Sequence, residues 1–156
     1  MSSHLPAPKE IRDLFTDLLD REITLSTSAP LAPGPTVPAS VGVLVDDSLE
    51  IAALVVADLP LSAYAGPALG LVPPASAQEA VDAGRLDEVL VENLYEVVNI
   101  ISSLFNAPGA RHVRLHALHP AGGALDTNLR MRALTLGRRE DVEVTVAGYG
   151  TGRLSL

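Results

Sequence analysis

Four polar side chains between residues 92 and 103 have the types and the spacing needed to act together. Glu92, Glu96, Asn99 and Ser103 follow one another at helical intervals. At about 100° per residue, these positions fall within one narrow strip of an α-helix. A carboxylate can pair with a cation, and a carboxamide can both donate to a water molecule and accept from it. The pattern therefore indicates a carboxylate–carboxamide surface able to meet a cationic group and orient a water.

A helix from about Leu86 to Phe105 is expected to carry this strip. The face opposite the strip is apolar and consists of Leu90, Leu94, Val97, Ile101, Leu104 and Phe105. Glu88 extends the polar strip, and Tyr95 and Ser102 fall at its edge. Such segregation predicts a helix that buries its aliphatic face in the core and leaves the strip in water.

The rest of the chain predicts an α+β fold with a largely antiparallel sheet. An amphipathic helix is expected over residues 8–21, and Asp46-Asp47-Ser48 has the side chains of a hairpin turn. Ser76 and Glu79 form a capping-box pattern ahead of the long helix. Strands are expected at 22–28, 40–46, 49–57, 111–118, 129–136, 142–147 and 153–156, and a short helix at 61–71. This order places one long central helix and the N-terminal helix against one sheet.

The stretch Glu92-Asn-Leu-Tyr-Glu96-Val-Val-Asn99-Ile-Ile-Ser-Ser103 resembles the signature of the CheC/CheX family. That signature is an acidic or Ser residue, three spacers, Glu, two spacers, Asn, then aliphatic residues and a small residue. The order of the flanking elements agrees, so the resemblance spans nearly the whole chain, 1–156, as a single CheC-like domain. Ser103 stands where CheX-like members usually have Gly. The first helix has Asp13 where a second copy of the motif would have Asn, so a single copy makes the chain closer to CheX.

In that family the motif hydrolyses the aspartyl-phosphate of a phosphorylated response-regulator receiver domain. The resemblance implies that Asn99 positions the attacking water and that Glu96 pairs with the receiver's active-site lysine. Glu92 and Ser103 would belong to the docking surface. The receiver would supply the magnesium ion, so no cofactor or metal of the chain's own is expected. The resemblance also implies a homodimer paired through its sheets, for which the two terminal strands are candidates.

Two other functions remain open at this stage. The chain could be a non-catalytic interaction module of two-component signalling, for which the single motif copy and Ser103 are arguments. It could also be a structural subunit related to flagellar-switch proteins.

Composition excludes several classes of function. The 156 residues suit one domain, and 47% of them are hydrophobic, which is enough for a core. A formal charge of −8 argues against binding to nucleic acid or to an anionic membrane surface. There is no cysteine, hence no disulfide or thiolate zinc site. The first ten residues lack the pattern of a secretory signal, and no apolar run reaches about 18 residues, so we expect a cytoplasmic protein.

Two further motifs have simpler explanations than a functional site. His112 and His116 would share one face of a strand and His119 the other, so the three cannot converge on a metal without a bend. Gly148-Tyr-Gly-Thr-Gly152 is glycine-rich, but no helix follows that could receive a phosphate, and we expect a turn there.

Overall fold

The fold combines a six-stranded sheet with helices, as the computed structural model shows. It describes residues 5–19, 22–28, 31, 38–63, 74–84, 86, 88–106, 108–109, 112–121, 129, 131, 139–146 and 150–156. The helices are α1 (Pro8–Leu19), α3 (Pro74–Ala83) and α4 (Glu88–Ser102), which a 3₁₀ turn, η1 (Ser103–Phe105), extends. The strands are β1 (Ile23–Thr27), β2 (Ala39–Val45), β3 (Ile51–Asp58), β4 (Arg114–His119), β5 (Asp141–Val146) and β6 (Gly150–Ser155).

The sheet has the strand order β1-β5-β6-β3-β2-β4, and every neighbouring pair is antiparallel. Two hairpins, β2–β3 and β5–β6, are joined through the pairing of β3 with β6. In the β2–β3 turn the carboxylate of Asp46 accepts from the backbone N–H groups of Ser48 and Glu50, at 2.9 and 3.0 Å. The predicted α+β class, antiparallel sheet and hairpin are confirmed.

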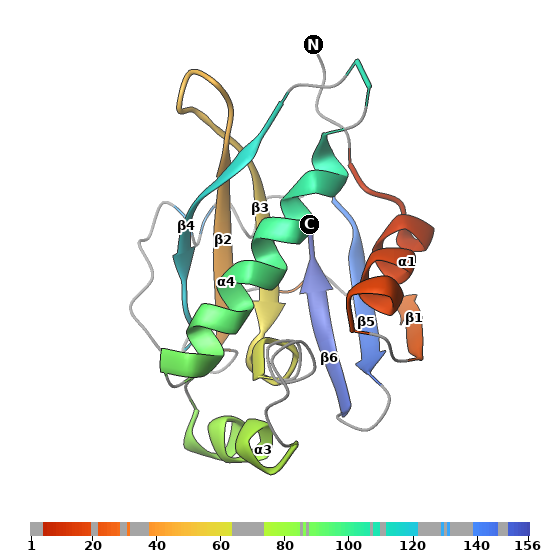
Figure 1. Cartoon of the computed structure of the whole chain (residues 1–156), viewed down its shortest axis with the longest axis vertical. Helices are drawn as coiled ribbons and strands as arrows, with labels where there is room; N and C mark the ends of the chain where they lie inside the picture. The colour runs from red at the N-terminus through yellow and green to blue at the C-terminus, as the bar shows by residue number, and fades with distance from the viewer. Residues whose placement is uncertain are drawn as a thin grey trace.

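Helices α4 and α1 cover one face of the sheet, with α4 running obliquely across the strands (Figure 1). Ile11 and Phe15 of α1 and Leu90, Leu94 and Val97 of α4 are all buried in one continuous apolar core with the strands. At Gly42, a β-carbon would stand 2.7 Å from Cγ1 of Val98, so the helix packs directly onto the backbone of β2. The sheet is therefore the platform that fixes the position of α4.

The opposite face of β2 and β3, called here the outer sheet face, is also apolar. Val41 and Val56 pack there against Leu31, and Val43 and Val45 pack against Leu129. Every residue of β2 except its first is consequently buried, as expected of a strand covered on both faces.

The strand expected at 129–136 is wrong where the structure describes it. Leu129 and Met131 are helical, and residues 132–136 lie outside the described part. Leu129 packs against Val43 and Val45 on the outer sheet face instead of joining the ladder. A short apolar segment has no periodicity that separates strand from helix.

Three smaller expectations also need correction. Helix α3 begins at Pro74, whose fixed φ suits a first turn, so Ser76 lies inside the helix and is not its cap. The helix expected at 61–71 starts earlier, with residues 59–63 helical and 64–71 outside the described part. Gly150–Gly152 form the start of β6 and not a turn, while residues 148 and 149 are outside the described part. Among the described helices, none is both long and apolar enough to cross a bilayer.

Candidate functional site

Helix α4 presents its polar strip to solvent over its whole length. Glu92, Glu96, Asn99 and Ser103 are all exposed, while Leu90, Leu94, Val97, Val98 and Ile101 are buried beneath them. The expected helix from 86 to 105 is α-helical from Glu88 to Ser102 and finishes in the 3₁₀ turn η1. The sequence therefore placed the strip on the correct face. The functional roles assigned to these residues stay predictions.

The side chains of Glu96 and Asn99 are available for a partner. Among the described residues, neither side chain has a hydrogen-bond or ion-pair partner, and neither has Glu92. Residues three apart on a helix are neighbours, so the carboxylate and the carboxamide stand side by side one turn apart. Together they can accept from a cation and hold a water.

Serine hydroxyls bond back to the helix where the strip ends. Ser102 Oγ donates to the carbonyl of Asn99 at 2.5 Å, and Ser103 Oγ donates to the carbonyl of Ile100 at 2.6 Å. Ser102, expected at the edge of the strip, is buried, whereas Ser103 is exposed. These bonds lie just where the α-helix becomes 3₁₀. Asn99 therefore lies in the last α-helical turn, on a backbone that the neighbouring hydroxyl helps to fix.

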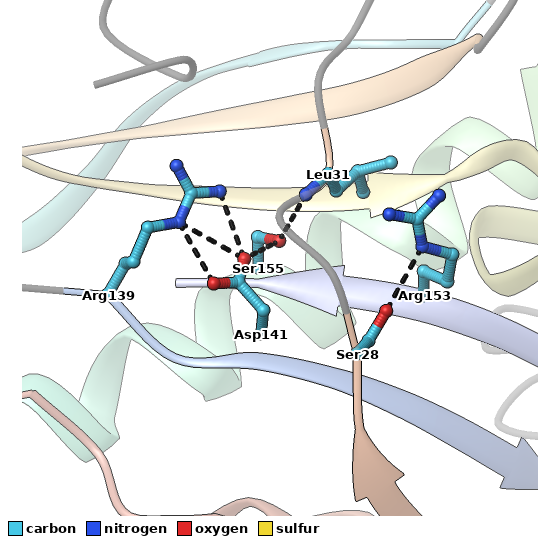
Figure 2. Close-up of polar contacts among 6 residues, drawn as sticks. All are labelled: Ser28, Leu31, Arg139, Asp141, Arg153 and Ser155. Carbon is cyan, nitrogen blue, oxygen red and sulfur yellow. Dashed lines mark hydrogen bonds and ion pairs between the residues drawn. The ribbon is translucent and has the colours of Figure 1, made fainter. Parts of the chain in front are cut away.

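A densely hydrogen-bonded side-chain cluster lies away from α4, at the ends of β5 and β6 (Figure 2). The guanidinium of Arg139 donates three hydrogen bonds of 2.9–3.1 Å to the carboxylate of Asp141. Ser155 Oγ donates to the same carboxylate and accepts from the backbone N–H of Leu31. Burial alone would raise the pKa of Asp141, but hydrogen bonds from Arg139 and Ser155 outweigh it and lower the pKa below its ordinary value. This cluster, called here the Arg139 clip, ties Leu31 to the outer sheet face.

Sequence reasoning did not find the clip, because its members are distant in the chain. Leu31 and Ser155 are 124 positions apart. The side chains of Asp141 and Ser155 come together only because β5 pairs with β6. No local motif marks such a contact.

Asp58 is a second carboxylate in a restricted environment. It ends β3, and its Oδ1 accepts from the backbone N–H of Leu61 at 2.9 Å, which caps the helical residues 59–63. Burial raises the pKa of Asp58, against the lowering effect of that bond and of nearby Arg153. Its capping bond makes it a structural group.

The histidines do not form a metal centre in the part of the chain that the structure describes. Nδ1 of His112 lies 3.7 Å from Oδ1 of Asp47, and both side chains are well exposed. No group of three or more potential ligands converges among the described residues.

Comparisons with known proteins bear on the fold. No protein-family model matches the chain, and no curated protein matches it. Among solved structures, the chain is similar to the FliM middle domain from H. pylori, with a TM-score of 0.53 and 10% identity over 94% of this chain and 82% of that one. The FliM chain of a FliM–SpeE complex from H. pylori gives 0.56 and 8%, over 94% and 78% of the two chains.

FliY from Thermotoga maritima gives a TM-score of 0.55 and 13% identity, over 92% of this chain and 80% of that one. FliM and FliY middle domains share the CheC-like fold, so the chain has a CheC-like fold. At these identities the likeness establishes the arrangement of elements. What the site does has to be argued from its residues.

Proposed function

We propose that this protein is a CheX-like phosphatase that hydrolyses the aspartyl-phosphate of a response-regulator receiver domain. The observation that supports the proposal best is the exposed pair Glu96 and Asn99, one turn apart on the central helix of a CheC-like fold. The resemblance of residues 92–103 to the CheC/CheX signature supplies the reaction.

In this reaction the phosphatase, called here the helper protein, has only a small chemical role. A water attacks phosphorus, the bond between phosphorus and the aspartyl oxygen breaks, and inorganic phosphate and the free carboxylate leave. The receiver brings the reactive acyl phosphate and the magnesium ion, so the helper mainly holds the water in line. The carboxamide of Asn99 would accept one hydrogen bond from that water and donate another. Glu96 would form an ion pair with the receiver's lysine, and this pair would fix the position of α4 relative to the phosphoryl group.

The proposal is tested by the decay of labelled phosphate from purified receiver domains of the same organism. Asn99→Ala should lower the maximal acceleration by about 100-fold with little change in KM, because water positioning acts in the transition state. Glu96→Ala should mainly raise KM, because the ion pair acts in docking. Glu79→Ala, on the exposed surface of α3, is the matched control. Equal decay with wild-type protein and Asn99→Ala would refute the proposal.

A second candidate is a non-catalytic CheC-like interaction module of two-component signalling. The similarity to FliM and FliY middle domains, one of them in a complex with SpeE, supports this alternative, as does Ser103 in place of the usual glycine. It predicts that a receiver binds while its phosphate decays at the unassisted rate. A homodimer and a cytoplasmic location remain expectations under either function.

A further inference from the structure

The exposed arc of α4 is wider than the motif. Besides Glu92, Glu96, Asn99 and Ser103, it includes Glu88, Val89 and Tyr95. Val89 is 54% exposed and Tyr95 is 44% exposed, and they are two of the four large hydrophobic residues that are exposed in the described part of the chain. At about 100° per residue they lie on opposite sides of the polar strip, about 60° from Glu92 on each side. The strip is therefore a row of carboxylates bordered by two apolar side chains.

The carboxylates of this row repel one another. Glu88, Glu92 and Glu96 are spaced four apart, and each like-charged pair at this spacing destabilises a helix by about 0.2–0.5 kcal/mol. Helix α4 contains no Lys or Arg, and no described residue forms an ion pair with the three carboxylates. The helix dipole stabilises Glu88, which lies in the first turn, but Glu92 and Glu96 lie beyond that turn and have no such compensation inside the described fold. Uncompensated repulsion of this kind is expected where a partner supplies the opposite charge.

The charge of the arc selects the kind of partner. A second copy docking symmetrically on this face would place the carboxylate row against itself. An anionic lipid surface or a nucleic acid would be repelled in the same way. A protein surface that carries Lys or Arg side chains and apolar groups beside them complements the row and both of its borders.

We propose that Val89 and Tyr95, with Glu88 and Glu92 between them, determine which receiver domain this protein binds. The receiver would place basic side chains over the carboxylate row and apolar side chains against the two borders. The choice of a receiver as the partner rests on the proposed function, but the contacts extend beyond the two residues to which that function assigns chemistry. Tyr is a frequent energetic anchor of protein interfaces, which makes Tyr95 the principal contact.

Binding is measured by calorimetry with receiver domains of the same organism, held in the phosphorylated form by beryllium trifluoride. The double variant Val89→Ser/Tyr95→Ser should weaken binding at least about tenfold. Glu92→Gln should weaken it by several-fold at low salt and flatten its salt dependence, because one screened attraction is lost. Leu49→Ser and Glu79→Gln, at an exposed apolar and an exposed acidic position elsewhere, are the matched controls and should bind as the wild type does. Circular dichroism and Tm show whether each variant is folded.

The two proposals fail in different ways. If the double variant is folded and binds as tightly as the wild type, the docking inference is overturned even if Asn99→Ala abolishes phosphatase activity. If binding falls in the double variant while Asn99→Ala still accelerates decay, the docking inference stands and the proposed catalytic role of Asn99 fails. If no receiver binds, both proposals are overturned. If the free chain self-associates and the double variant makes it monomeric, the occupant of the arc is a second copy and the inference is overturned.

Discussion

Replacement of Arg139 tests how much the Arg139 clip contributes to the stability of the sheet. The side chains of Arg139 and Asp141 are only 13% and 12% exposed, so Arg139→Ala leaves a poorly solvated carboxylate with Ser155 as its remaining side-chain donor. A hydrogen bond to a charged group contributes about 1.5–3 kcal/mol, whereas an exposed ion pair contributes about 0–1 kcal/mol. We therefore expect a loss of about 2 kcal/mol in the free energy of unfolding at pH 7.

The assay is urea unfolding followed by circular dichroism. At an m-value near 2 kcal/mol/M, the midpoint should fall by about 1 M. The pKa of Asp141 is lowered in the folded state, so its stabilising contribution is complete above the pKa of the unfolded chain. That contribution is lost as the pH falls through the folded-state pKa. The difference in free energy of unfolding between Arg139→Ala and the wild type should therefore become smaller in acid.

The matched control is Arg12→Ala, which removes an arginine 3.8 Å from Asp13 in a pair whose side chains are about half exposed. It should change stability by less than about 0.5 kcal/mol. The proposed role of the clip would be refuted if Arg139→Ala lost as little free energy of unfolding as the control does. It would also be refuted if that loss stayed constant from pH 7 into acid.

Three further substitutions test other parts of the fold. Gly152→Ala would place a β-carbon 2.4 Å from Cβ and 2.5 Å from the backbone N of Leu61, so we expect a loss of at least about 2 kcal/mol in the same urea assay. Leu49→Gly should raise stability by up to about 1 kcal/mol, because Leu49 has φ of 63° in the hairpin and glycine adopts that conformation freely; a loss of stability would contradict this. Asp58→Asn keeps the oxygen that accepts from Leu61 and should not destabilise the protein at pH 7. The folded-state pKa of Asp58 is raised, so its contribution to folding is complete below the unfolded pKa and is lost as the pH rises through the folded pKa. The free energy of unfolding of the wild type should therefore rise relative to that of Asp58→Asn as the pH falls. The opposite trend would contradict this.

The placement of α4 could be predicted from the sequence because its signal is local and periodic. The helix is fifteen residues long, and the apolar side chains among them recur at helical spacing. This spacing specifies both the element and its buried face. The hairpin at Asp46 has a local cause as well, since one carboxylate satisfies two backbone N–H groups of the turn. Helix α4 carries the candidate site, and β2 of the hairpin packs directly beneath it.

Contacts that depend on the assembled sheet could not be predicted in this way. Gly152 lies in a glycine-rich stretch that indicates a turn, yet it is required because Leu61 packs against the backbone of β6. Leu129 looks like the start of a strand, but in the fold it packs on the outer sheet face against Val43 and Val45. Both outcomes depend on residues distant in the chain.

We propose above that a receiver domain docks on the exposed arc of α4. The most direct measurement is a titration of the isotopically labelled protein with a beryllium-trifluoride-loaded receiver, followed through its backbone amide NMR signals. We expect the signals of residues 88–103 to change most, with those of β1, β5 and β6, on the sheet face turned away from α4, unchanged. Changes confined to that sheet face, with the α4 signals unaffected, would contradict it.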